Sequence, residues 1–152
     1  MRMKFLFLTL GLALAGAFAG GASAQETRVT VESTKSYEQT VDKLKAAVGQ
    51  GGMMIMAQVD QGNMLSMAGL KLKATLFLVG NPNVGKQLFE QDHGVGLYVP
   101  LRVFVTETQD GKTYVSYDKP SSQLKQFNNQ KIDMVAGMLD QKVQGLAEMA
   151  TH

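Results

Sequence analysis

The sequence has no cysteine and no tryptophan among its 152 residues. Without cysteine the chain can form no disulfide, thiolate nucleophile, zinc–thiolate site or iron–sulfur cluster. Its net charge of +2 is also too small to suggest a nucleic-acid-binding domain. A hydrophobic fraction of 45% with 18% charged residues indicates a chain that folds. The length corresponds to one domain.

The first 24 residues have the pattern of a secretory signal peptide. Arg2 and Lys4 form a basic start, residues 5–19 are largely apolar, and Ala22 and Ala24 give the A-x-A pattern of a cleavage site. The apolar run is shorter than the ~20 residues that span a membrane. We therefore expect residues 1–24 to be a signal peptide. Residues 25–152 should then be a single exported domain, periplasmic or secreted, that has no membrane anchor after cleavage.

The first half of this domain alternates between strand and helix patterns. Alternating residues predict a strand over 27–34, and the capping-box pair Ser36 and Gln39 predicts the start of a helix. An apolar stripe continues that helix through Tyr37, Val41, Leu44 and Val48 until glycines at 49, 51 and 52 end it. A buried strand over 53–59, a short helix within 60–70 and a strand over 73–79 should follow. One helical turn is expected over 86–91.

The second half predicts a hairpin and a long helix. Asp110-Gly111 is a two-residue turn signal between strands over 97–108 and 112–117. This turn would pair Phe104 with Tyr117 and Thr106 with Val115, and Arg102 would share their face. A helical region starts at Pro120, and its later part has helical spacing at Ile132, Val135, Leu139, Val143 and Leu146.

The order β-α-β-(α)-β-β-β-α indicates an α+β fold. We expect two layers, with a mostly antiparallel four- to five-stranded sheet and helices packed on one face.

Residues 80–86, with the sequence GNPNVGK, match the phosphate-loop pattern G-x-x-x-x-G-K. The pattern needs a following Ser or Thr whose hydroxyl binds Mg²⁺, but Gln87 stands there. Neither a D-x-x-G nor an N-K-x-D segment follows. We therefore interpret the segment as a turn after a strand.

Methionine is abundant, with eight residues after position 24. Met54 and Met56 would share a strand face, Met64 and Met67 would share a helix face, and His93 could complete a site for Cu(I). This arrangement makes a periplasmic copper-binding protein one alternative function. The competing interpretation is that these methionines fill the core.

His93 and Arg102 are the other candidates for chemistry. His93 lies between Asp92 and Gly94, which makes a hydrolase using His93 a further alternative, although no G-x-S-x-G motif supports it. Arg102 is a lone cation in an apolar strand. It could stack on Tyr117, bind an anionic ligand, or form an ion pair with Asp118.

An ordered set of segments resembles the family named domain of unknown function 302. The matching segments are Ser36–Val41 with Leu44, Met67–Leu70, Leu78–Pro82 with Gly85, Val99–Val103, Asp110–Lys112, and Val115–Tyr117 with Pro120. The resemblance implies a small, often exported α+β domain that forms a dimer, and in that family the Gly-Asn-Pro segment is a turn. The family commonly has Asp-His after the second strand, where this chain has Asp60-Gln61. It has no established activity to carry over.

The sequence therefore favours a non-enzymatic ligand-binding or protein-interaction module of unknown activity that uses no cofactor. We expect a homodimer whose further partner is a small molecule or a periplasmic protein, with no role for nucleic acid. The expected ligand pocket lies near sheet ends, at Asn81, Pro100, Arg102 and Tyr117.

Export can be tested by intact-mass measurement of the protein recovered outside the cytoplasm. Cleavage after Ala24 predicts a mass that begins at Gln25. A recovered chain that retains residues 1–24 would contradict the signal peptide.

Overall fold

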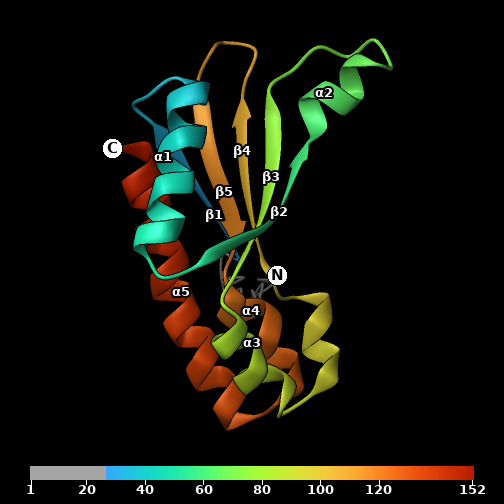
Figure 1. The fold of residues 1–152 in the computed structure, drawn as a ribbon, viewed down its shortest axis with the longest axis vertical. Coiled ribbons are helices and arrows are strands. Elements are labelled where there is room, and N and C mark those ends of the chain that lie inside the picture. The colour runs from blue at the N-terminus through green and yellow to red at the C-terminus, as the bar shows by residue number, and fades with distance from the viewer. Residues whose placement is uncertain (1–26) are drawn as a thin grey trace, which may run out of the picture.

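The computed structural model describes residues 27–152, and its centre is a five-stranded sheet in the order β1-β5-β4-β3-β2 (Figure 1). Every neighbouring pair of strands is antiparallel. The predicted signal peptide, residues 1–24, lies outside the described residues. The strands are β1 (Arg28–Ser33), β2 (Met54–Asp60), β3 (Ala74–Gly80), β4 (Leu101–Glu107) and β5 (Thr113–Asp118).

Two long helices, α1 (Tyr37–Gln50) and α5 (Gln130–Thr151), pack together and against one face of the sheet. This arrangement confirms the predicted two-layer α+β fold. Within residues 27–152, none of the helices is long and apolar enough to cross a membrane. The shorter helices lie at the ends of the sheet, with α2 (Gln61–Ser66) at one end, and α3 (Pro82–Phe89) and α4 (Pro120–Leu124) at the other (Figure 1). Two 3-10 turns are η1 (His93–Leu97) and η2 (Lys125–Phe127).

Local sequence signals account for both long helices. At the start of α1, the Ser36 hydroxyl accepts from the Gln39 N–H, and the Gln39 side chain accepts from the Ser36 N–H, which confirms the capping box. Asn129 caps α5 in a similar way, because its side chain accepts from two N–H groups of the first turn. In α5, all five apolar residues that the helical spacing predicted, from Ile132 to Leu146, are buried.

Alternate residues of the central strands point toward α1 and α5 and form the core. Phe77, Val103, Val105 and Val115 are fully buried there. We call the other side of the sheet the open face, because no described helix packs over its centre. The open face contains the partly exposed or exposed side chains of Leu76, Leu78, Arg102, Phe104, Thr106, Tyr114 and Ser116.

The strand predicted over 53–59 exists as β2, but it is not buried. Among residues 27–152, β2 is an edge strand that pairs only with β3, and Met54 and Met56 are 54% and 44% exposed. A short apolar run has the same pattern at the edge as at the centre of a sheet. The prediction of burial was therefore wrong.

The predicted register of the β4–β5 hairpin is wrong by one residue. Phe104 lies opposite Ser116, and Thr106 lies opposite Tyr114. Gly111 has a φ of 80°, and its N–H donates to the Thr108 carbonyl. This geometry is a turn closed by a left-handed glycine, which has one residue more than a two-residue loop.

The shift in register decides which side chains share a face. A slip of one residue moves every side chain of a strand to the opposite face. Tyr117 therefore pairs with the buried Val103 on the core side, whereas Arg102 and Phe104 lie on the open face. The expectation that Arg102 and Tyr117 share a face was wrong.

One buried polar atom of the core permits a stability test. Thr113 is 2% exposed, and its hydroxyl has no hydrogen-bond partner in the described part of the chain. Thr113→Val replaces this hydroxyl with a methyl group, so we expect the free energy of unfolding to rise by about 1 kcal/mol. Urea denaturation measures this change.

The matched control is Thr75→Val, because Thr75 is 4% exposed but its hydroxyl lies 2.7 Å from that of Tyr37. The free energy of unfolding of that variant should fall by about 1 kcal/mol. A Thr113→Val protein that is less stable than the wild type would disprove the assignment.

Candidate functional site

The structure divides the four predicted site residues between two places. Asn81 and Pro100 line a pocket at the α3 end of the sheet, which we call the end pocket. Arg102 lies in a hollow of the open face. Tyr117 touches the border of that hollow, but it is 5% exposed and belongs to the core. Burial raises the pKa of the Tyr117 phenol, and the carboxylates of Asp140 and Glu148 raise it further.

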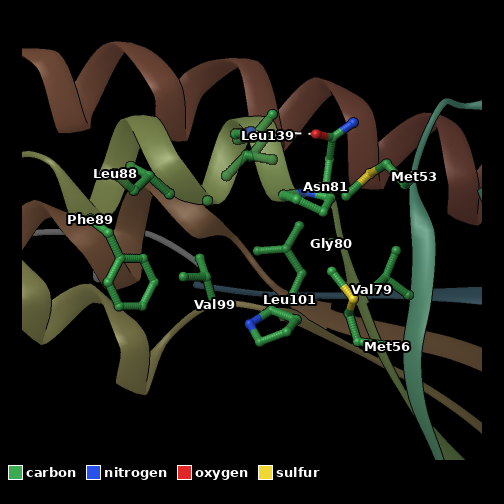
Figure 2. A pocket seen from close by; sticks show the side chains of 14 residues that line it. Met53, Met56, Val79, Gly80, Asn81, Leu88, Phe89, Val99, Leu101 and Leu139 are labelled. Carbon is green, nitrogen blue, oxygen red and sulfur yellow. Dashed lines mark hydrogen bonds between the residues drawn. The ribbon is translucent and has the colours of Figure 1, made fainter.

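The end pocket is a largely apolar cavity of about 170 Å³ between α3, the end of β3 and the segment before β4 (Figure 2). Buried core side chains form much of its wall, including Val79, Leu88 and Leu139. Methionine side chains line one side, and Phe89 lines the opposite side. The complete lining is Met53, Met56, Val79, Gly80, Asn81, Pro82, Val84, Gly85, Leu88, Phe89, Val99, Pro100, Leu101 and Leu139.

Asn81 connects two segments beside this pocket through its side-chain hydrogen bonds. It ends β3 and caps α3, where its side-chain oxygen accepts from the N–H groups of Asn83 (2.9 Å) and Val84 (3.4 Å). Its side-chain nitrogen donates to the Gly52 carbonyl at 2.8 Å. Asn81 therefore fixes both α3 and the loop before β2.

The same capping explains why residues 80–86 do not form a phosphate loop. We expected a turn followed by one helical turn over 86–91, but α3 already begins at Pro82 and contains Gly85 and Lys86. The N–H groups of Asn83 and Val84 already donate to Asn81. A phosphate loop needs an extended loop with free N–H groups, so the geometry does not favour nucleotide binding.

The hollow of the open face has a volume of about 400 Å³. Asp118, the predicted ion-pair partner of Arg102, instead forms a two-pronged pair with Arg28 at 2.8 and 3.0 Å. This carboxylate raises the pKa of the Arg28 guanidinium. Arg102 is exposed and has no ion-pair partner within residues 27–152.

The methionines proposed for copper do not converge. Met54 and Met56 lie in the first half of β2. Met64 lies in α2 and Met67 just after α2, and both therefore come beyond the far end of β2. A seven-residue strand is roughly 23 Å long, so the two pairs lie far apart. All four side chains are between 44% and 80% exposed, so the interpretation that they fill the core was also wrong.

His93 is exposed at the start of η1, and its ring centroid lies 6.4 Å from that of Phe89. Among the described residues, no group of three or more His, Cys, Asp or Glu side chains could hold a metal ion. The sequence reasoning did not identify Met53, Phe89 or Leu139 as part of a site. Each comes from a different segment, and no short motif joins them.

Comparison with known proteins gives the family and the fold. A family model described as "Domain of unknown function DUF302" matches residues 29–150. The crystal structure of an uncharacterized conserved DUF302 protein from Bacillus stearothermophilus has a TM-score of 0.77 at 18% sequence identity. This likeness covers 83% of the present chain and 99% of the other, and it shows the shared fold.

Curated relatives include two proteins named as fluoride-specific ion channels. The channel FluC 1 of Brucella suis is 34% identical over 94 residues, which are 61% of this chain and 37% of that protein. The channel FluC 1 of Brucella abortus is also 34% identical over 94 residues, which are 35% of that protein. The present chain thus spans about a third of the length of these relatives.

The family match covers most of the chain, and the solved structure has the same arrangement of sheet and helices. By sequence and by fold, this protein belongs to the DUF302 family, whose function is unknown.

Proposed function

We propose that residues 25–152 form an exported, non-enzymatic interaction module that assembles as a homodimer through the open face of its sheet. The observation that supports this proposal is the uncovered apolar surface on that face. Leu76, Leu78 and Phe104 are only partly buried there. Exposed apolar surfaces of this kind typically mark protein–protein contacts.

The apolar surface continues onto an apolar arm, formed by α2 and the turn that follows it. Gln61 borders the hollow of the open face, and Met64 and Leu65 follow it at helical spacings of three and four residues. These side chains therefore lie on the same side as the open face. The exposed apolar residues of the arm are Met64, Leu65, Met67, Leu70 and Leu72.

Their areas indicate that the open face and the apolar arm together form the dimer interface. Five strands about 4.8 Å apart, each with six or seven residues at about 3.4 Å, cover roughly 400–550 Å². A stable interface buries about 800 Å² on each partner. The sheet alone is therefore too small, and the apolar arm adds the missing contact area.

The dimer is tested by placing a charge on the arm with Met64→Glu. Burying this carboxylate without a partner should weaken dimerisation at least tenfold, because burial of an unpaired charge is strongly unfavourable. Sedimentation equilibrium measures the dissociation constant.

The matched control is Met138→Glu on α5, because the two methionines are similarly exposed, at 55% and 51%. That variant should dimerise like the wild type. A wild-type protein that stays monomeric at 100 µM, or a Met138→Glu variant that weakens the dimer equally, would disprove the proposed interface.

A second candidate function is a contribution to fluoride tolerance, together with a fluoride-specific ion channel. The similarity to two Brucella proteins of that name favours it, and Arg102 offers a cation in the hollow of the open face that has no ion-pair partner in the described part of the chain. Deletion of the gene should then lower the fluoride concentration that stops growth, and a plasmid copy should restore it. Unchanged fluoride tolerance in the deletion strain would remove this candidate.

A further inference from the structure

We infer that the end pocket is a binding site for a small, uncharged aromatic molecule. The pocket lies at the α3 end of the sheet, and the apolar arm lies at the opposite end (Figure 1). This inference is therefore independent of the proposed dimer.

The lining excludes charged ligands. None of the pocket's 14 lining residues is charged, and Asn81 has the only polar side chain among them. The Asn81 oxygen already accepts two N–H groups, and its nitrogen already donates to the Gly52 carbonyl. A charged or strongly polar guest would lose its water without gaining a partner, which is unfavourable.

The size of the pocket fits one ring. Its volume of about 170 Å³ is close to that of an engineered apolar cavity of about 150 Å³ that binds benzene. Val79 and Leu88 are almost completely buried in the core, so their part of the pocket wall is rigid. Phe89, in contrast, is 41% exposed, so its ring is available to a guest that enters from solvent.

The chemistry of the walls favours an aromatic ring over an aliphatic one. The side chains of Met53 and Met56 lie on one side of the pocket, and the Phe89 ring lies on the other (Figure 2). Thioether sulfurs make favourable contacts with aromatic rings, and two aromatic rings attract each other edge to face or in offset stacks. A saturated ring of the same size would gain neither contact.

The test is a titration of the exported protein, labelled with ¹³C at its methionine methyl groups, with toluene. Methylcyclohexane, which has the same carbon skeleton without aromaticity, is the matched ligand. We expect saturable ring-current shifts at Met53 and Met56, and none at Met64 and Met67 beside α2 or at Met149 near the end of α5. Toluene should bind at least fivefold more tightly than methylcyclohexane.

A pair of glycine variants tests the location. Gly85 lines the pocket, and apart from the backbone of its own helix a Cβ there would have no heavy atom within 4 Å, so Gly85→Leu adds a bulky side chain at the pocket without a clash. This variant should bind toluene at least tenfold more weakly. Gly137→Leu is the control, because Gly137 is also helical with open space around it but lies outside the pocket.

Three results would overturn the inference. Absence of a saturable shift would show that the pocket binds no aromatic ring. Equal affinity for methylcyclohexane would refute the preference for aromatic ligands. An equal loss of affinity in the Gly85→Leu and Gly137→Leu proteins would place the binding elsewhere.

Discussion

The packing of α5 against the core side of the sheet is the contact on which the rest of this structure depends. With no cysteine, non-covalent contacts alone hold the helix layer to the sheet. Each large buried side chain of α5 contributes about 1.5–3 kcal/mol, and these residues run from Ile132 to Leu146. Near its end, the Thr151 carbonyl accepts from the N–H of Thr34, which joins α5 to the chain after β1. The helix thus runs from the α3 end of the molecule to the segment that follows β1 (Figure 1).

This one-sided packing also determines which apolar surfaces remain free. α1 and α5 cover a single face, so alternate residues of the same strands point to solvent on the other side. Leu139 illustrates a second consequence, because it faces the core from α5 and also forms part of the wall of the end pocket. Both surfaces for which binding is proposed therefore depend on α5, because it lies on the face opposite the open face and supplies part of the wall of the end pocket.

The features that could be predicted from sequence are those encoded within a few residues. The capping box at Ser36 and the apolar stripe of α5 each depend on side chains three or four positions apart, and both were correct. The predictions that were wrong concern features that depend on the complete topology. Whether Met54 and Met56 are buried depends on β2 being an edge strand, and no local pattern encodes the order of strands. The separation of Arg102 from Tyr117 came from one extra turn residue.

The segment Gly80-Asn81-Pro82 shows how a short motif can suggest the wrong chemistry and still mark the right place. Its likeness to a phosphate loop comes from residues that end β3 and begin α3, because Asn81 caps the helix and Pro82 is well suited to its first turn. Gly80 has an additional role, since a Cβ at this position would lie 3.4 Å from that of Pro100 and 3.5 Å from the Met56 methyl. A larger side chain would crowd these two residues, which both line the end pocket. The motif therefore shapes an apolar cavity beside a capped helix, and that geometry favours an uncharged ring over a phosphate.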